Sequence, residues 1–240
     1  MNGRFEGKVA LVAGGTGGLG RAVSLAFLGE GAKVEVTYVV PGEWAELQEV
    51  VAKLGGGALK GHEVDVTDET AVNGLVEEIV ESQGRLDVLV NTVGAYAGGL
   101  KLWEMETRVF EQMMALNLRS GYALARAAAR TMLKQKRGAI VNVAAKAAFD
   151  HAAGAAAYAA SKAAALAMFD SLAADLKGSG VRANSILPSI IDTAANRKAM
   201  PKADFAKWPK PEDIARVILF LCSEEAKVIQ GAAVSVYGDS

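Results

Sequence analysis

The chain has 240 residues, with 26 basic and 27 acidic side chains and a formal net charge of −1. This balance gives no electrostatic footprint for a nucleic acid or an anionic membrane surface, so we expect neither partner. Hydrophobic residues make up 51% of the chain, and no linker or charge block divides it, which predicts one domain over residues 1–240. The opening residues lack a signal-peptide core and no apolar run approaches the ~18 residues of a membrane span, which predicts a cytoplasmic protein.

Short β-branched runs alternate with amphipathic helical patterns along the chain. The predicted strands cover residues 9–13, 33–39, 59–65, 88–91, 139–143, 181–186 and 233–236. Apolar residues at three- and four-residue spacing predict helices over residues 22–28, 43–54, 69–83 and 211–222. Apolar strands separated by helices are typical of a parallel sheet. We therefore predict an α/β fold of the Rossmann type, a doubly wound parallel sheet of about seven strands with helices on both faces.

A glycine-rich turn follows the first predicted strand and leads into a helix. Its sequence is Ala13-Gly14-Gly15-Thr16-Gly17-Gly18-Leu19-Gly20-Arg21. Glycines here allow the backbone to approach a pyrophosphate, which the positive helix N-terminus attracts. A flexible loop without a ligand is the alternative, but strand, turn and helix occur in the order that dinucleotide binding requires. The predicted contacts to NAD or NADP in this turn are Gly14, Thr16, Gly18, Leu19 and Gly20.

The ends of the third and fourth strands extend the predicted cofactor site. Asp65 and Val66 follow the third strand and could face an adenine, although Asp65 could equally be a turn residue before the next helix. Asn91 and Gly94 follow the fourth strand and could border the cofactor at the carboxyl edge of the sheet. The N-terminal half of the chain is therefore the predicted dinucleotide-binding part, and the C-terminal part the substrate side.

The end of the second strand leaves the choice of nucleotide open. Tyr38 stands there, a predicted cofactor contact, without the acidic residue expected to bind a ribose diol. No arginine replaces that acid. Arg21 or Lys33 could approach the 2′-phosphate of NADP, or both could be solvated surface charges. The preference between NAD and NADP stays undecided.

Tyr158 and Lys162 are separated by four residues, which places both on one face of a helix. A phenol beside an ammonium group is typical of a proton-donating pair. The alternative is an exposed tyrosine and a lysine in a salt bridge. Ala145 stands thirteen positions before the tyrosine, so that position carries no hydroxyl.

Five motifs occur in one order along the chain: the glycine turn, Asn91-x-x-Gly94, Asn117, Tyr158-x-x-x-Lys162 and Pro188-x-x-x-x-Thr193. Together they resemble the short-chain dehydrogenase/reductase family over almost the full chain. The resemblance implies an NAD(P)-dependent oxidoreductase in which the tyrosine donates a proton and the lysine favours the tyrosinate. It also implies cofactor contacts from the pair itself and from Pro188, Ile191 and Thr193. Asn117 would support a water route to the pair, or alternatively satisfy helix backbone groups.

A narrower resemblance lies in residues 94–99, 145–148 and 192–208, which are similar to dihydropteridine reductase. That family also lacks the serine that most relatives carry thirteen positions before the tyrosine. A hydroxyl aimed at a developing alkoxide is commonly worth about 10²- to 10³-fold in rate. Reduction of a conjugated nitrogen-rich ring need not build charge on a tetrahedral carbonyl oxygen, so the missing donor costs less. Other parts of the chain look like general bacterial-type oxoacyl reductases.

The substrate-side residues follow from these segments. Tyr96 could stack on a flat heterocycle, and Lys146 could bind a ring carbonyl, with Asn196 and Arg197 as further substrate contacts. Residues 194–208 form the predicted lid, in a stretch too irregular to indicate a helix. The alternatives are a core-edge role for Tyr96 and a surface connection in place of the lid, with Phe205 and Trp208 packed as anchors. Lys146 could instead pair with Asp150.

No metal site is predicted, because His151 is a lone histidine without a second ligand cluster. Cys222 lies in an apolar run and is expected to be a buried small hydrophobe. The resemblance to short-chain dehydrogenases/reductases implies a homodimer or homotetramer formed through paired long helices, and the small residues over 152–174 suit such close apposition.

The favoured function is NAD(P)H-dependent reduction of a quinonoid dihydropterin or a similar conjugated small molecule. One alternative is a carbonyl or 3-oxoacyl-thioester reductase. Another is a catalytically weak nucleotide-binding regulatory protein that lost efficient catalysis with the serine.

Overall fold

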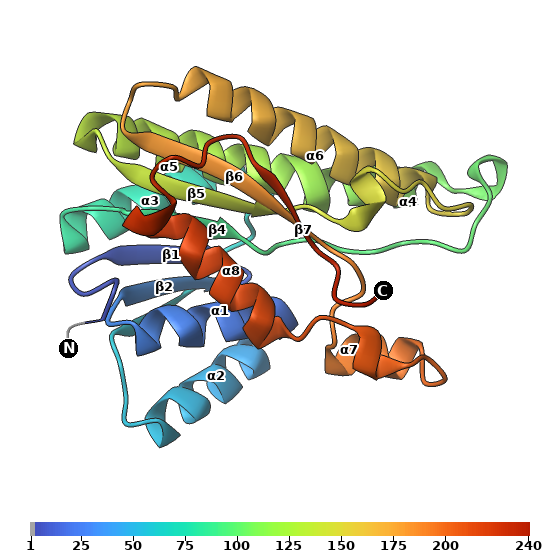
Figure 1. Ribbon diagram of the computed structural model, residues 1–240, viewed down its shortest axis with the longest axis horizontal. Coiled ribbons are helices and arrows are strands. Elements are labelled where there is room, and N and C mark those ends of the chain that lie inside the picture. The colour runs from blue at the N-terminus through green and yellow to red at the C-terminus, as the bar shows by residue number, and fades with distance from the viewer. Residues whose placement is uncertain (1–2) are drawn as a thin grey trace.

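The computed structural model describes residues 3–240 and confirms the predicted seven-stranded parallel sheet (Figure 1). The strands are β1 (Val9–Ala13), β2 (Lys33–Tyr38), β3 (Leu59–Glu63), β4 (Val88–Asn91), β5 (Gly138–Val143), β6 (Val181–Pro188) and β7 (Ala233–Val236). They are arranged in the order β3-β2-β1-β4-β5-β6-β7, with every neighbouring pair parallel. The order reverses between β1 and β4. Ligands of such sheets bind outside the carboxyl ends of the strands at this switch point.

Helices cover both faces of the sheet (Figure 1). They are α1 (Gly18–Gly29), α2 (Pro41–Lys53), α3 (Glu69–Gln83), α4 (Thr107–Met114), α5 (Ser120–Gln135), α6 (Ala156–Asp175), α7 (Ala194–Ala199) and α8 (Pro211–Cys222). Helices α1, α2 and α8 pack on one face, whereas α3, α5 and α6 pack on the other. No helix within residues 3–240 is long and apolar enough to cross a membrane.

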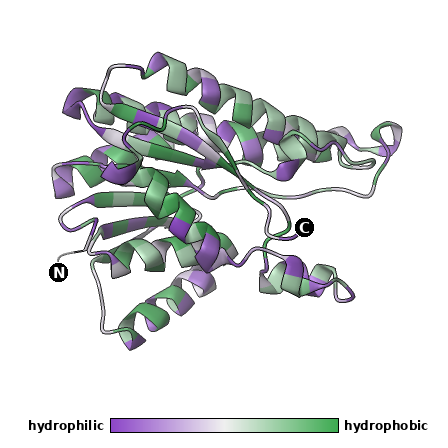
Figure 2. Cartoon of the chain, in the orientation of Figure 1, coloured by the Kyte–Doolittle hydropathy of each residue, from purple (hydrophilic) through white to green (hydrophobic). Residues whose placement is uncertain are grey.

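The two faces of the sheet bury alternate residues of the same strands. In β1, Ala10 and Val12 belong to the core beneath α1 and α8, while Val9, Leu11 and Ala13 belong to the core beneath α3, α5 and α6. Figure 2 shows the central strands as largely hydrophobic, in contrast to the mixed surface of α2. Because both faces are covered, these strands read as continuous apolar runs in the sequence.

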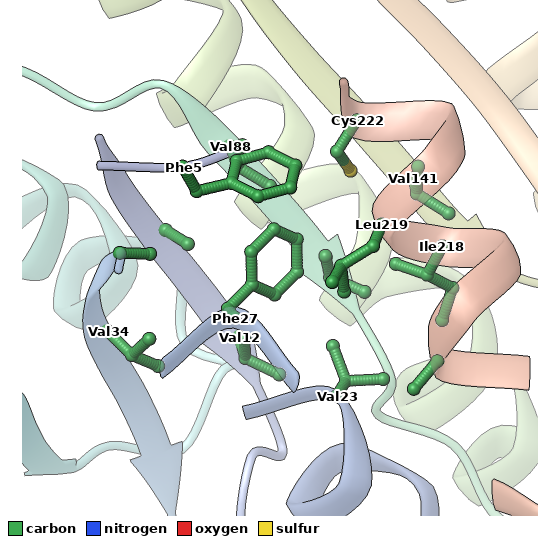
Figure 3. Packing of buried hydrophobic residues seen from close by; sticks show 14 of the residues in the cluster. Phe5, Val12, Val23, Phe27, Val34, Val88, Val141, Ile218, Leu219 and Cys222 are labelled. Carbon is green, nitrogen blue, oxygen red and sulfur yellow. The ribbon is translucent and has the colours of Figure 1, made fainter. Parts of the chain in front are cut away.

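Aromatic and aliphatic side chains close the core between α1 and α8. The ring of Phe27 meets that of Phe5 edge-on, with centroids 4.8 Å apart. Figure 3 shows Leu219 of α8 and Val12 of β1 beside Phe27, with Cys222 in the same cluster. Cys222 is buried, and burial raises the pKa of its thiol to about 12. The prediction of a buried small hydrophobe is therefore confirmed.

Element boundaries differ from the predictions where tertiary contacts act. Strand β3 ends at Glu63, so the predicted strand end at Asp65 was wrong. Helix α1 begins at Gly18, directly on the glycine turn, rather than at residue 22. The predicted irregular stretch contains the short helix α7, because the Thr193 side chain accepts a hydrogen bond from the backbone N–H of Asn196 and caps it.

Candidate active site

Helix α6 places Tyr158 and Lys162 on one face, as predicted. The lysine is only 5% exposed, and its ammonium group donates a hydrogen bond to the carbonyl oxygen of Val143 at 2.9 Å. That carbonyl lies at the end of β5. The pair is therefore anchored at the carboxyl edge of the sheet, beside the switch point.

Burial shifts the two groups in opposite directions. Burial, together with the neighbouring Tyr96, raises the pKa of Tyr158 to about 12, and burial lowers the pKa of Lys162 to about 8. At neutral pH the phenol therefore keeps its proton and most of the lysine is charged. The protein groups around Tyr158 do not produce the lowered pKa that the resemblance implies. They hold the residue in the form that can donate a proton.

Tyr96 covers Tyr158 from the loop that follows β4. The ring centroids are 4.9 Å apart, and the planes meet at 77°. Tyr96 is 68% exposed, so its ring lies at the protein surface and not in the hydrophobic core. The loop is tied to the segment before α6 by a hydrogen bond from the N–H of Gly99 to the carbonyl of Gly154 at 3.0 Å. Tyr96 is therefore an exposed ring beside Tyr158, and its stacking on a flat substrate stays a prediction.

Asn117 joins the same loop to α6. It lies in the π-helical turn η2 (Ala115–Arg119), which interrupts the helix between α4 and α5. Its Oδ1 accepts from the N–H of Ala95 at 2.9 Å, and its Nδ2 donates to the carbonyl of Ala95 at 3.0 Å. The Nδ2 also donates to the Ser161 hydroxyl at 2.9 Å, which in turn donates to the carbonyl of Tyr158. The alternative prediction was that Asn117 satisfies backbone groups of a helix. The groups that it satisfies are those of Ala95, in the loop after β4.

Gly94 lies between Lys162 and the clamp that the Asn117 amide forms with the backbone of Ala95. A Cβ atom added to it would lie 2.9 Å from Oδ1 of Asn117 and 3.0 Å from Nζ of Lys162. Any larger residue would push one of these side chains away. The glycine therefore keeps the clamp and the ammonium group adjacent.

Ala145 begins the turn that follows β5, and no hydroxyl stands there. The residue is 5% exposed and makes no side-chain hydrogen bond. The next residue, Lys146, donates to the carbonyl of Ser240 at 3.4 Å, and its ammonium lies 5.2 Å from the centre of the Tyr237 ring. No ion pair joins Lys146 to Asp150 among residues 3–240.

The glycine turn has the shape of a dinucleotide cradle. Gly14 has a φ of +72°, which favours glycine, and a Cβ at Gly20 would lie 2.0 Å from the carbonyl oxygen of Gly14. Helix α1 starts at Gly18 with no side-chain cap and no acidic residue in its first turn. Its first N–H groups are therefore neither capped by the side chain of the preceding residue nor neighboured by an acidic residue of their own turn. These residues fit a pyrophosphate.

The last of the five motifs, residues 188–193, packs directly against this turn. A Cβ at Gly18 would lie 2.8 Å from the methyl carbon of Thr193, so the two residues pack against each other. Pro188 ends β6 and is buried, and Ile191 packs against the core beneath α1. The fold thus brings both predicted cofactor segments together, and Leu19 is buried beside them.

Other predicted cofactor contacts are arranged differently. The Asp65 carboxylate accepts from the N–H and hydroxyl of Thr67 at 2.9 and 2.7 Å, which is the turn role held as its alternative. Val66 is buried in the core beneath α3. The Tyr38 ring stacks on Trp44, with centroids 5.5 Å apart and planes within 6°.

Asn91 is buried at the end of β4. Its Nδ2 donates to Oδ1 of Asn142 on β5 at 3.1 Å, and its Oδ1 accepts from the N–H of Val93. The amide thereby shapes the turn after β4. Thr92 continues this edge, since its hydroxyl donates to the carbonyl of Ala13 at 2.7 Å and joins the ends of β4 and β1.

Asn196 and Arg197 stabilise the lid segment from within. The amide of Asn196 donates to the carbonyl of Ile191 at 2.8 Å. The Arg197 guanidinium pairs with both carboxylate oxygens of Asp192 and lies 4.9 Å from the centre of the Phe205 ring. Trp208 is buried at the end of the segment, as expected for an anchor, and its ring lies 5.0 Å from that of Phe205.

The geometry joins a buried lysine, a protonated tyrosine and a glycine cradle at one sheet edge, and comparisons with known proteins agree. A family model described as short chain dehydrogenase matches residues 8–204. The chain belongs to the short-chain dehydrogenase family. It is accordingly an NAD(P)-dependent oxidoreductase. The narrower likeness to dihydropteridine reductase stays a prediction.

Short-chain dehydrogenases of several activities are similar to the chain over nearly its full length. It is 32% identical over 247 residues to the 3-oxoacyl-[acyl-carrier-protein] reductase FabG of Thermotoga maritima, covering 98% of each chain. It is 34% identical over 246 residues to the D-threitol dehydrogenase of Mycolicibacterium smegmatis, covering 98% of this chain and 93% of that protein. The structure of ElxO with NADP bound is 28% identical, with a TM-score of 0.90 over 96% of this chain and 97% of that chain.

Sequence reasoning missed two side chains that organise the site. Ser161 lies inside the tyrosine motif, and its spacing of three from Tyr158 could have indicated a bond to that carbonyl. Glu43 reaches the glycine turn through a contact that no local pattern reveals. Within residues 3–240, no group of three His, Cys, Asp or Glu side chains could hold a metal ion, and His151 is exposed.

Proposed function

We propose that this short-chain dehydrogenase uses NAD(P)H to reduce a flat, conjugated, nitrogen-rich ring, with a quinonoid dihydropterin as the representative substrate. The observation that carries the proposal is the environment of Tyr158. This phenol keeps its proton up to a pKa of about 12 and lies beside an exposed aromatic ring, while position 145 offers no hydroxyl. The nicotinamide, when bound, supplies a hydride.

In this proposal the chain's own residues hold and move one proton. Tyr158 donates its phenolic proton to a ring nitrogen, and the Lys162 ammonium stabilises the phenolate that remains. Asn117 is a positioning residue that fixes the loop carrying Tyr96, whose face or edge contacts the flat ring. Further proposed substrate contacts are Lys146, Asn196 and Arg197.

The proposed cofactor contacts extend from the glycine turn to the last motif. They are Gly14, Thr16, Gly18, Leu19, Gly20, Tyr38, Asp65, Val66, Asn91, Gly94, Tyr158, Lys162, Pro188, Ile191 and Thr193. Residues 194–208 are the proposed lid, which would exclude water from the transferred hydride.

The alanine at 145 favours a ring substrate over a simple ketone. Carbonyl reduction places negative charge on one oxygen, and a hydroxyl donor aimed at it commonly contributes about 10²- to 10³-fold in rate. Delocalised charge in a conjugated ring does not need that donor.

A second candidate is reduction of a carbonyl or a 3-oxoacyl thioester. It is supported by the 32% identity to a protein named 3-oxoacyl-[acyl-carrier-protein] reductase over nearly the whole chain. The proton donor for that reaction would again be Tyr158. The developing oxyanion, however, would receive one hydrogen bond fewer than in a site that has a serine at position 145.

Initial rates of NADH and NADPH oxidation test the proposal. The substrates are freshly generated quinonoid dihydropterin, simple ketones and an acetoacetyl thioester, each with the wild type and with Tyr158→Phe. Pterin turnover that Tyr158→Phe abolishes supports the proposal. Turnover of ketones or thioester alone supports the second candidate, and nucleotide binding without any turnover indicates a regulatory protein.

The matched variant Ala145→Ser separates the two substrate classes. We expect it to raise ketone or thioester turnover by about 10²-fold or more, and pterin turnover by less than about tenfold. A strong gain in pterin turnover would count against the role assigned to Ala145.

We also propose that the chain forms a homodimer or homotetramer through α5 and α6. Exposed apolar side chains on these elements support it, namely Tyr122 and Leu133 on α5 and Phe149 shortly before α6. Sedimentation equilibrium tests this assembly. A monomer at micromolar concentration would reject it.

A further inference from the structure

A carboxylate from α2 reaches the glycine turn. The hydroxyl of Thr16 donates a hydrogen bond to Oε2 of Glu43 at 2.9 Å, across 27 residues of sequence. Thr16 is 3% exposed, whereas Glu43 is half-buried. The bond therefore holds one carboxylate oxygen at the turn and leaves the second oxygen without a partner among the side-chain hydrogen bonds of the described chain.

Glu43 supplies a carboxylate close to the end of β2, where the strand itself has no acidic residue. The strand ends at Tyr38 without an acidic residue, and α2 begins at Pro41, so Glu43 stands in the first helical turn beyond the strand. The neighbouring Trp44 stacks on Tyr38, which fixes this turn of the helix against the strand end. A short connection followed by a helix thus brings a carboxylate to the glycine turn from the side of β2.

The two cations that could receive a 2′-phosphate are otherwise engaged or distant. Arg21 pairs with Glu46 of α2 at 2.8 Å. Lys33 is the first residue of β2 and donates to Gln83 at 3.0 Å. At about 3.3 Å per residue, it lies roughly 16 Å along the strand from Tyr38, at the opposite edge of the sheet.

We propose that Glu43 accepts the ribose diol of the adenosine half and makes this chain selective for NAD(H) over NADP(H). Ribose hydroxyls donate to a carboxylate, whereas a 2′-phosphate would place a second anion beside it. Thr16 then acts as a positioning residue, because its hydroxyl proton is directed to Glu43 rather than to a phosphate. The inference rests on the proposed function only in requiring a dinucleotide at this turn.

Equilibrium binding tests the inference without any substrate. NADH and NADPH are titrated into the full chain while the fluorescence of the reduced nicotinamide is followed, and calorimetry repeats the comparison with the oxidised forms. We expect the wild type to bind NADH at least tenfold more tightly than NADPH. Glu43→Gln should bring the two dissociation constants within about threefold, mainly through tighter NADPH binding.

Two further variants make the comparison specific. Thr16→Val keeps the carboxylate but removes its anchor, and should reduce the selectivity by part of the Glu43→Gln effect. Glu49→Gln removes an exposed carboxylate further along α2, which pairs only with Lys53, and should leave the selectivity unchanged. Thermal unfolding shows whether each variant folds. If Glu43→Gln does not fold, Thr16→Val provides the test.

The outcomes separate this inference from the proposed function. Preference of the wild type for NADPH, or an unchanged ratio in a folded Glu43→Gln protein, would overturn the role of Glu43. Failure to bind either nucleotide would overturn the inference together with the dinucleotide site. Selective NADH binding that Glu43→Gln abolishes supports the inference even if no pterin is reduced, in which case only the proposed substrate fails.

Discussion

The ring of Tyr96 meets the ring of Tyr158 edge-on at 4.9 Å, so an exposed loop residue covers the proposed proton donor. This contact contributes to the high pKa of Tyr158, after burial itself. Two hydrogen bonds fix the loop that carries Tyr96. Asn117 binds the backbone of Ala95, and the N–H of Gly99 binds the carbonyl of Gly154. The pKa of the donor therefore depends in part on a segment outside the helix that bears it.

Replacing Tyr96 should lower the pKa of Tyr158. In Tyr96→Ala the donor becomes more exposed and loses an unfavourable neighbour, so its pKa moves from about 12 toward the ordinary value of 10. Phenolate absorbance, measured with and without Tyr158→Phe in the same background, isolates this one titration. Tyr122→Ala, which removes an exposed tyrosine on α5, is the control, and an unchanged midpoint in Tyr96→Ala would contradict the prediction.

Gly94→Ala should destabilise the fold and disturb the site. Its Cβ would press on Oδ1 of Asn117 and on Nζ of Lys162, and overpacking of this kind costs about 1–3 kcal/mol in the free energy of unfolding. Urea denaturation measures the loss. Gly74→Ala on α3 is the matched control, since no atom lies within 4 Å of its Cβ, and it should be neutral or stabilising by up to about 1 kcal/mol. Equal effects in both variants would reject the packing argument.

Asn117→Ala should cost about 3 kcal/mol in the free energy of unfolding. It removes the partners of both backbone groups of Ala95, which are partly buried, and one partner of the buried Ser161. A fully buried group left unpaired costs about 1–3 kcal/mol, and a partly buried one costs less because water can reach it. Hydrogen exchange at the Ala95 amide should accelerate. Asn117→Asp retains the acceptor and should protect that amide better, so identical exchange in the two variants would argue against the clamp.

Lys162 should make stability increase with pH above neutrality. Its pKa is about 8 in the folded chain and 10.5 when unfolded, so between these values the unfolded chain binds more protons and raising the pH favours folding. The difference corresponds to about 3 kcal/mol in the free energy of unfolding across this window. The increase is absent below pH 8 and complete near 10.5.

Urea denaturation of wild type and Lys162→Met from pH 7 to 10.5 checks this expectation. Cys222 and Tyr158 have raised pKa values and act in the opposite direction, but both occur in either protein. The comparison is therefore made in a Tyr158→Phe background, where the difference between the two proteins reports the titration of Lys162. Parallel stability curves would show that the lysine does not lose its proton in the folded state.

Local patterns predicted the elements well, because short-range physics fixes them. Asp68 accepts from the N–H groups of Thr70 and Ala71 at the start of α3, and Gly84 adopts a left-handed conformation at its end, so this helix matches its predicted range. The strands β1, β4 and β7 also match. Where Thr193 caps α7, the cap residue was visible, but the helix is only 6 residues long and has no apolar repeat.

The parts of the site that were not predicted depend on contacts between distant residues. The π-helical turn around Asn117 has no periodic signal of its own. The bond between Thr16 and Glu43 requires the connection from β2 to α2 to fold back onto the glycine turn. The side chain of Lys146 contacts Ser240, 94 residues later, rather than the carboxylate of Asp150. Sequence spacing selected the candidate residues, whereas the side chains and backbone groups that contact them are set by the topology.

Thr193 belongs to two segments at once. Its hydroxyl starts α7, while its methyl group rests against Gly18 at the start of α1. Thr193 is therefore a direct physical link through which a ligand at one segment could act on the other. If the proposed lid encloses a substrate while a dinucleotide occupies the turn, thermodynamic reciprocity requires each ligand to change the affinity of the other by the same factor. The dissociation constant measured for one ligand would then depend on whether the other is bound.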